Sequence, residues 1–303
     1  MNTQLLKSLF TPEMIFYDYE TTTGFKFHHL DVEGEFLYVE SNKLPQTLEF
    51  IRAHGPIRLT LNAQRGFALP DLRFLQGIEH LIEGLAIVGG GLDLQGLEQC
   101  VNLKYLQLDD DRAQPLDFGR FPHLRHLRLD WKPHYSQTTF PDSLTAVHLW
   151  GYRPQTGFNE TSLHNLRNVT TLSLVQAAGQ DLSLLQHCGP LTRLGVAYGR
   201  SLTDISALAR HAGTLQRVDL DKCRKISDFS VLAQLTKLQW LNVCDCGAIP
   251  SVSFVQHLPE LRHLVFLGTT VNDGNLSFLQ GIEYVRFNNK PHYSLKVKHF
   301  EEG

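Results

Sequence analysis

Cysteine and histidine are the side chains of this sequence that could bind a metal ion or act as nucleophiles. The chain has five cysteines and 15 histidines. Cys223, Cys244 and Cys246 lie near one another in repeat register, but the C-x-x-C pair typical of zinc sites is absent. The histidines are scattered, and His126 and His148 are more simply read as surface imidazoles than as ligands. We therefore expect neither a metal ion nor another cofactor.

Motifs for catalysis are absent as well. The sequence contains no G-x-S-x-G, no P-loop and no cysteine–histidine pair in a plausible context, so we expect no enzyme activity. With 42% hydrophobic residues, 19% charged residues and a net charge of −3, the composition indicates a folded protein without the basic footprint of a nucleic-acid or membrane-surface binder. We find no apolar run long enough to span a membrane and no secretory signal. Together with the odd number of cysteines, this predicts a cytoplasmic protein.

The elements that carry these side chains repeat. A six-residue pattern recurs ten times, as in LKYLQL (Leu103–Leu108) and LQWLNV (Leu238–Val243). It consists of a leucine, two variable residues, an aliphatic residue, one variable residue and a second aliphatic residue. The equivalent inward aliphatic residues are Leu85, Leu106, Leu127, Val147, Leu172, Leu194, Val218, Leu241, Leu264 and Val285, at steps of 20 to 25 residues. This period is typical of leucine-rich repeats, each of which adds one strand to a curved parallel sheet.

The segments between these strands are also alike. DLSLLQHCGPL, DISALARHAGTL, DFSVLAQLTKL and SVSFVQHLPEL each begin with Asp or Ser and continue with apolar residues at helical spacing. We predict a short α or 3₁₀ segment on the convex side of each repeat. The fold class is therefore an α/β leucine-rich repeat solenoid, with a parallel β-sheet on its concave face.

The segment Cys223–Val243, CRKISDFSVLAQLTKLQWLNV, and the preceding SLTDISALA resemble internalin-type short bacterial repeats. They also resemble the cysteine-containing repeats of F-box proteins, with Cys223, Ile226, Ser227 and Asp228 at the matching places. The resemblance covers roughly residues 56–290 and implies the fold, whereas such repeats serve many partners.

Three regions follow from the repeat. Residues 1–55 are predicted to form an N-terminal cap with a degenerate repeat, residues 56–290 the solenoid, and residues 291–303 a C-terminal cap. In the first region, EFLYVES and, just beyond it, PIRLTLN are predicted strands with PQTLEFIRAHG as a helix between them. The pentapeptide KPHYS occurs twice, at Lys132–Ser136 and Lys290–Ser294, and we interpret it as structural.

The register of the strands also predicts which side chains face a partner. All three tryptophans, Trp131, Trp150 and Trp240, are expected on the concave face or at its edge, and Trp, Tyr and Arg dominate binding hot spots. The predicted partner-binding residues are Tyr105, Asp109, Asp110, His126, Arg128, Asp130, Trp131, His148, Trp150, Tyr152, Arg217, Asp219, Trp240, His263, Tyr284 and Arg286.

The sequence thus predicts a non-enzymatic module that binds another protein through its concave face. The aspartates near Trp131 suit a partner with a basic surface. A bacterial inhibitor or immunity protein and an adaptor are both compatible with this prediction. The alternatives are the substrate-recognition part of an enzyme system, such as a ubiquitin-ligase-like effector, and recognition of a ligand outside the cell.

Overall fold

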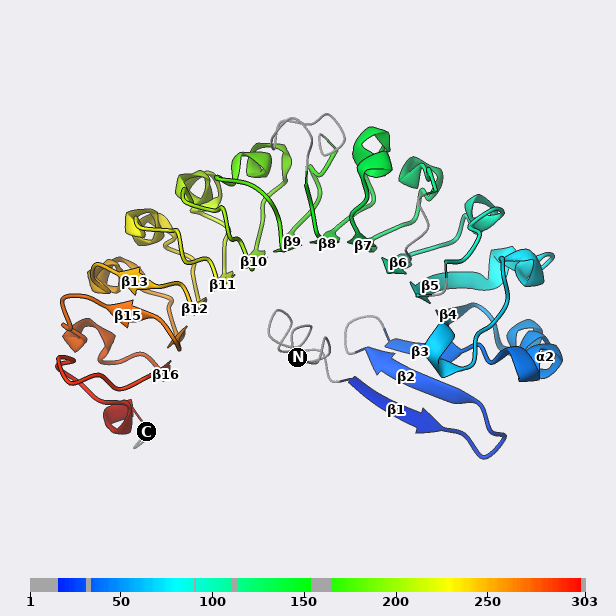
Figure 1. Ribbon diagram of the computed structural model, residues 1–303, viewed down its shortest axis with the longest axis horizontal. Helices are drawn as coiled ribbons and strands as arrows, with labels where there is room; N and C mark the ends of the chain where they lie inside the picture. The colour runs from blue at the N-terminus through cyan, green and yellow to red at the C-terminus, as the bar shows by residue number, and fades with distance from the viewer. Residues whose placement is uncertain (1–15, 31–33, 90, 110–113, 154–164, 301–303) are drawn as a thin grey trace. The chain divides into compact units, whose positions relative to one another are not determined.

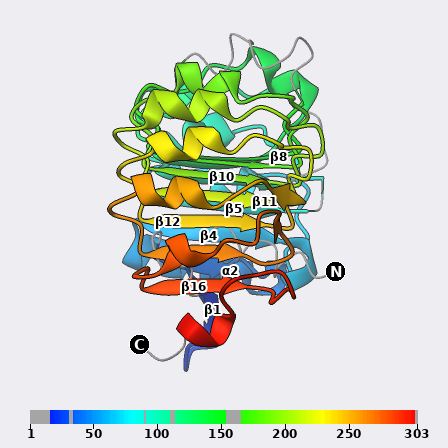
Figure 2. The same cartoon turned by 90° about the vertical axis from the view of Figure 1, so that its left-hand side faces the viewer.

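The computed structural model describes residues 16–30, 34–89, 91–109, 114–153 and 165–300. It divides into two units, Met1–Val147 and His148–Gly303, which we describe separately. In both units short strands alternate with 3₁₀ helices, and the strands of each unit lie side by side with the helices on one face (Figures 1 and 2). This arrangement confirms the predicted α/β leucine-rich repeat solenoid.

Unit 1 begins with an antiparallel hairpin and continues as a parallel sheet. Strands β1 and β2 pair antiparallel, β2 pairs antiparallel with β3, and β3 to β7 are parallel in chain order. The strands are β1 (Phe16–Glu20), β2 (Lys26–Leu30), β3 (Gly34–Tyr38), β4 (Ile57–Asn62), β5 (Ile82–Val88), β6 (Tyr105–Asp109) and β7 (His126–Asp130).

The helical segments of unit 1 are short except for one. Helix α2 (Leu44–His54), which begins with a proline in its first turn, lies between β3 and β4 as predicted. The 3₁₀ helices are η1 (Ser41–Lys43), η2 (Ala63–Arg65), η3 (Arg73–Leu75), η4 (Glu79–Leu81), η5 (Leu97–Gln99), η6 (Phe118–Arg120) and η7 (Pro133–Gln137). Strand β8 (Ala146–Trp150) contains the division between the units.

Unit 2 is a parallel sheet whose neighbouring strands again follow chain order. Its strands are β9 (Thr171–Val175), β10 (Arg193–Ala197), β11 (Arg217–Asp221), β12 (Trp240–Cys244), β14 (His263–Phe266) and β16 (Tyr284–Phe287). A second, two-stranded sheet joins β13 (Ala248–Ile249) to β15 (Thr270–Val271). The 3₁₀ helices are η9 (Ser183–His187), η10 (Ser206–His211), η11 (Ser230–Gln234), η12 (Ser253–His257), η13 (Ser277–Leu279) and η14 (Val297–Phe300).

The core of each unit consists of the residues that the repeat predicts. All ten equivalent aliphatic residues are at most 1% exposed. Within each unit the register places them directly opposite one another, as in Leu85, Leu106 and Leu127, or Val218, Leu241 and Leu264. Burial of apolar side chains stacked in this way is the main stabilising contribution in a repeat protein.

The polar residue at the start of each convex segment has the expected role in unit 2. Asp181, Asp204, Asp228 and Ser251 each accept a hydrogen bond from the backbone N–H two residues later, at 2.7 to 3.1 Å. The helix that follows is 3₁₀ in each case. A 3₁₀ turn is shorter in sequence than an α-helix of the same number of turns, which suits repeats of this length.

The second KPHYS segment packs against the last strand of unit 2. Tyr293 is 4% exposed, its ring lies edge-on to Phe287, and its hydroxyl accepts a hydrogen bond from Val271 N at 2.9 Å. His292 Nε2 lies 2.9 Å from Val271 O. These contacts agree with a structural role for the segment.

Candidate functional site

Five side chains on the concave face of unit 2 form a stack, which we call the ladder: Arg217, Trp240, His263, Tyr284 and Arg286. The guanidinium of Arg217 lies 4.5 Å from the centroid of the Trp240 ring. The rings of Trp240 and His263 are 3.2 Å apart between centroids, those of His263 and Tyr284 are 4.5 Å apart, and both pairs are tilted by 11°. The guanidinium of Arg286 lies 4.8 Å from the Tyr284 ring.

The ladder follows directly from the strand register. Arg217 pairs with Trp240, Trp240 with His263, and His263 with Tyr284 on neighbouring parallel strands. Each side chain therefore lies one strand spacing from the next, a separation at which planar groups can stack. Arg217, Trp240, His263 and Tyr284 thus come from four successive repeats, and Arg286 joins the Tyr284 end from the same strand, β16.

His263 is held neutral inside this stack. Burial, together with the positive charge of Arg217, lowers the pKa of His263 to about 4. A neutral imidazole presents a polarisable face to Trp240 and Tyr284 without adding a third positive charge between the two arginines. The ladder therefore carries its charge at its two ends.

The Arg217 end of the ladder rests on a buried ion pair. Arg217 Nε donates to Asp219 Oδ2 at 2.7 Å and its Nη2 donates to Asp219 Oδ1 at 3.2 Å. Asn242 Nδ2 donates to the same carboxylate at 2.5 Å. Burial raises the pKa of Asp219, while Arg217 and Asn242 oppose that shift. Arg217 and Asp219 lie on the predicted face, but both are buried, at 8% and 4% exposure, so the prediction that they are accessible was wrong.

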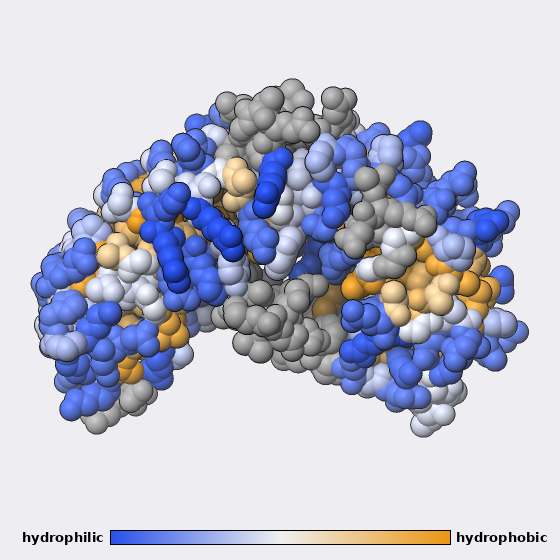
Figure 3. Space-filling model, viewed as in Figure 1, coloured by the Kyte–Doolittle hydropathy of each residue, from blue (hydrophilic) through white to orange (hydrophobic). Residues whose placement is uncertain are grey.

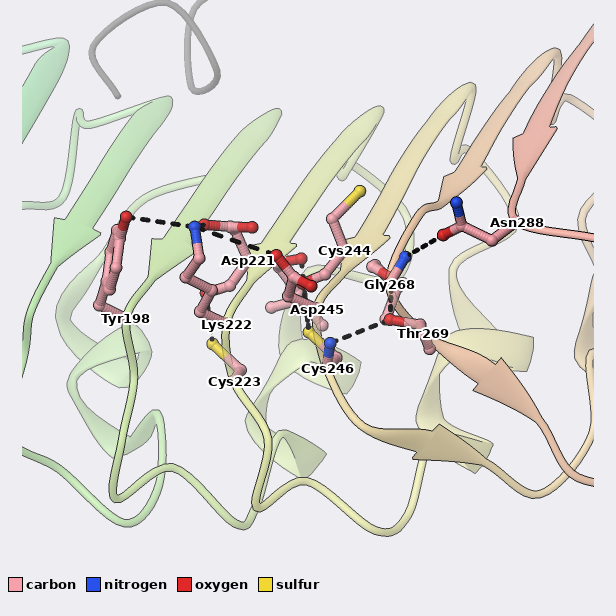
Figure 4. A network of polar contacts seen from close by, with 12 residues as sticks. Tyr198, Asp221, Lys222, Cys223, Cys244, Asp245, Cys246, Gly268, Thr269 and Asn288 are labelled. Carbon is pink, nitrogen blue, oxygen red and sulfur yellow. Dashed lines mark hydrogen bonds and ion pairs between the residues drawn. The ribbon is translucent and has the colours of Figure 1, made fainter. Parts of the chain in front are cut away.

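A second set of contacts joins the turns at the carboxyl ends of these strands (Figure 4). Lys222 Nζ donates to the Tyr198 hydroxyl at 3.2 Å and lies 3.6 Å from Asp221 Oδ2 and 3.9 Å from Asp245 Oδ2. Tyr198, Lys222 and Asp245 all have positive φ, between 51° and 53°, and each directly follows a strand. Such left-handed residues are uncommon outside glycine, and their recurrence shows that the same tight turn is built in three successive repeats.

The residue after the left-handed residue of each turn points into the core. Cys223, Cys246 and Thr269 occupy this slot at 0 to 1% exposure. Cys223 Sγ lies 3.4 Å from Asp221 O, and Cys246 Sγ lies 3.2 Å from Cys244 O. In Figure 4 the side chain of Cys244 points away from both. Cys223 and Cys246 therefore contribute to packing in the core.

The cysteines do not form part of a metal site within the described ranges. No group of three or more His, Cys, Asp or Glu side chains there is arranged to hold a metal ion. Burial raises the pKa of Cys100 and Cys188 to about 12 and that of Cys244 to about 11, so these three thiols remain protonated near neutral pH. Among the same residues, no helix has the length and apolarity needed to cross a bilayer.

The same face of unit 1 is organised differently. Tyr105, predicted to be exposed, is 2% exposed because it is part of an apolar cluster with Leu30, Phe36 and Ala86. The Phe36 ring lies edge-on to Tyr105 at 5.0 Å and stacks on His28 at 5.1 Å. The prediction failed because Leu30 and Phe36 come from the hairpin region before the regular repeats. On the side of unit 1 seen in Figure 3, apolar residues gather around β4 and β5.

Two further residues predicted at the binding surface are in the core. Trp131 is 5% exposed and lies edge-on to Tyr135, because alternation continues past Asp130 and points it inward with Leu129. Tyr152 is 0% exposed, because Gly151 adopts a φ of 69° and turns the chain inward as in the slot of Cys223. Placing these two residues on the surface was wrong.

The remaining predicted residues are half-buried or outside the described part. Asp109 accepts a hydrogen bond from Gln107 Nε2 at 2.6 Å, and Asp130 forms an ion pair with Lys132 at 2.8 Å. Asp110 lies outside the described residues. His126 and Arg128 of unit 1, and His148 and Trp150, are half-buried. In unit 1, the structure therefore does not bring the predicted aspartates together with an exposed tryptophan.

Sequence reasoning placed Arg217, Trp240, His263 and Tyr284 in one column but did not identify their stacking. The register also placed Leu267, which is 44% exposed, on this face, but Leu267 was not among the predicted partner-binding residues. Sequence reasoning missed the link from Lys222 to the Tyr198 hydroxyl. The signal for that link was present in the register, since equal positions in neighbouring repeats lie side by side. In the part of unit 2 seen in Figure 3, the surface is mostly hydrophilic with small apolar patches.

No protein-family model matches the chain, and no curated protein matches its sequence. Solved structures resemble it. Internalin C2 of Listeria monocytogenes is 22% identical, with 56% of this chain and 74% of that protein covered and a TM-score of 0.44. Internalin InlF of the same organism is 14% identical, with 77% and 81% covered and a TM-score of 0.45. A leucine-rich repeat protein of Leptospira interrogans is 16% identical, with 83% and 88% covered and a TM-score of 0.35. Similarity at this level carries no argument about function.

Proposed function

We propose that the protein is a non-enzymatic binding module that holds a protein partner on the concave face of β11 to β16. The single observation that carries this proposal is the ladder. It combines tryptophan, tyrosine and arginine, the side chains most enriched in binding hot spots, and holds them in fixed positions on strands. Side chains that are fixed before binding lose little conformational entropy on association, which favours affinity.

The exposure of one ladder ring also supports a partner. Tyr284 is 42% exposed, whereas Trp240 and His263 are half-buried in the stack. A large aromatic side chain that is held in position on a strand and remains accessible can pack directly against a partner.

We further propose a cytoplasmic location and a role as an inhibitor, immunity protein or adaptor. All five cysteines are free, which suits a reducing compartment. Burial raises the pKa values of Cys100, Cys188 and Cys244 and keeps these three thiols protonated near neutral pH.

The test is capture of partners from a lysate of the source cells on the immobilised full chain, followed by mass spectrometry. We expect at least one protein to be retained by the unsubstituted chain and by Tyr284→Phe, which keeps the ring, and to be lost with Tyr284→Ala. A partner retained equally by all three proteins would show that the ladder is not the binding site. Thermal melting of each variant establishes that its fold is intact.

A further inference from the structure

Arg286 differs from Arg217, although each provides one guanidinium end of the ladder. Arg217 is neutralised by the buried carboxylate of Asp219. Arg286 donates from Nη1 to Val285 O at 3.2 Å and lies over the Tyr284 ring, and it forms no ion pair with any described carboxylate. One end of the ladder is therefore electrostatically satisfied within the chain, whereas the other presents a cation that is held in place but not neutralised.

The surroundings of Arg286 are apolar on the same face. Val265 lies directly opposite it in the strand register and is half-buried. Leu267 and Tyr284, at 44% and 42% exposure, are two of the three most exposed large hydrophobic residues of the described chain. An unneutralised guanidinium beside exposed apolar side chains offers both a charge-assisted hydrogen bond and apolar area to the same ligand.

The described chain that follows Tyr284 is basic. Between Tyr284 and Phe300 the sequence contains Arg286, Lys290, Lys296 and Lys298 and no Asp or Glu, and Glu301 and Glu302 come directly after it. Two acidic residues near the site already have a cation: Glu283 lies 3.7 Å from Arg262, and Asp245, whose backbone N–H donates to Leu267 O, lies 3.9 Å from Lys222. Among the described residues around the site, the unneutralised charges are therefore positive, which favours a negatively charged group.

We propose that the surface formed by Val265, Leu267, Tyr284 and Arg286 binds an extended acidic protein segment in which a carboxylate is flanked by an apolar side chain two residues away on each side. Residues two apart in an extended segment point to the same face, so all three side chains can meet this surface. The carboxylate accepts hydrogen bonds from the guanidinium of Arg286, and the two apolar side chains pack one on Tyr284 and one on Leu267, which lie on either side of Arg286 in the strand register. Because Tyr284 is fixed between His263 and Arg286, the guanidinium is presented in a defined orientation. This inference rests on the proposed function and gives the partner its chemistry.

The test uses fluorescein-labelled heptapeptides Ser-Leu-Ser-X-Ser-Leu-Ser, in which X is Glu, Gln or Lys and lies two residues from each leucine, titrated by fluorescence anisotropy with the full chain. We expect the Glu peptide to bind at least tenfold more tightly than the Gln peptide, with affinity falling as salt rises. Arg286→Gln should abolish this preference, and Arg286→Glu should transfer it to the Lys peptide. The matched control is Arg200→Gln, which removes an equal charge from an exposed turn of the same unit and should leave the preference intact.

Three results would overturn the inference. They are no binding of the Glu peptide to the unsubstituted chain, equal binding of the Glu and Gln peptides, and equal losses in Arg286→Gln and Arg200→Gln. A single-stranded oligonucleotide that binds more tightly than the Glu peptide and is lost with Arg286→Gln would assign the site to phosphate instead. If partner capture still depends on Tyr284 while the peptides do not bind, the proposed function survives and only the acidic chemistry fails.

Discussion

The same strand face is used in different ways in the two units. In unit 1 it carries an apolar cluster in which Phe36 and Tyr105 are almost completely buried. In unit 2 it carries the ladder, whose members Trp240 and His263 are half-buried and whose Tyr284 is exposed. With the same repeat architecture, this face contributes to stability in unit 1 and remains accessible for binding in unit 2. The difference depends on the side chains in one column of the face.

The first way to test this contrast is to remove a ring from each unit. We expect Phe36→Ala to lower the free energy of unfolding by about 4 kcal/mol, because it leaves a cavity between His28 and Tyr105. Tyr284→Ala should lower it by less than about 1 kcal/mol, since the ring is largely in solvent. Urea denaturation measures both, and equal losses would contradict the division of roles.

The two units should also differ in their response to acid. Burial lowers the pKa of His28 to about 4, so the unfolded chain binds a proton that the folded chain does not between pH 6.5 and 4. Stability should therefore fall as the pH drops through this range, by about 3 kcal/mol for His28.

His263 of unit 2 has a similarly lowered pKa but is more exposed, so its share should be smaller. His28→Gln should flatten the pH dependence more than His263→Gln. Thermal melts at pH 7, 5.5 and 4.5 measure the pH dependence of each variant. If His263→Gln flattened the pH dependence more than His28→Gln, His263 and not His28 would be the main source of acid sensitivity.

For partner binding, we expect the larger effect from the ring in unit 2 rather than from the ring in unit 1. Loss of the Tyr284 ring should weaken partner capture about tenfold or more, as for a hot-spot residue, while leaving the melting temperature nearly unchanged. Surface plasmon resonance with the captured partner measures the dissociation constant. A change of less than twofold would mean that the partner uses another surface.

The smallest effect is expected at the acidic positions of unit 1. Asp130→Asn removes an ion pair with Lys132 in which both side chains remain partly exposed, and it should cost less than about 1 kcal/mol. Partner capture should not change. A strong loss of capture instead would support the basic partner that the sequence suggested and would move the site to unit 1.

The repeat period predicted the strands and their inward-facing residues. It did not predict contacts with residues that lie outside the regular repeats. The ten inward aliphatic residues and the column of Arg217, Trp240, His263 and Tyr284 follow from register alone. The burial of Tyr105 could not be predicted, because Leu30 and Phe36 lie outside the regular repeats. Trp131 was misplaced because strand alternation continues past Asp130 and points it inward with Leu129. Tyr152 was misplaced because Gly151 adopts a left-handed conformation after the strand and turns the next side chain inward. Residue type alone does not predict this turn, since Tyr198, Lys222 and Asp245 also adopt a positive φ.

Because Arg217, Trp240, His263 and Tyr284 come from four successive repeats, the number of repeats sets the length of this part of the ladder. Duplication or deletion of one whole repeat between β11 and β16 would keep the parallel pairing of neighbouring strands and change the stack by a single side chain. A partner that contacts both ends would then meet its contacts about one strand spacing, ~4.8 Å, nearer or farther apart. Related chains could therefore diverge in partner choice by gaining or losing repeats, without altering any residue of the remaining ladder.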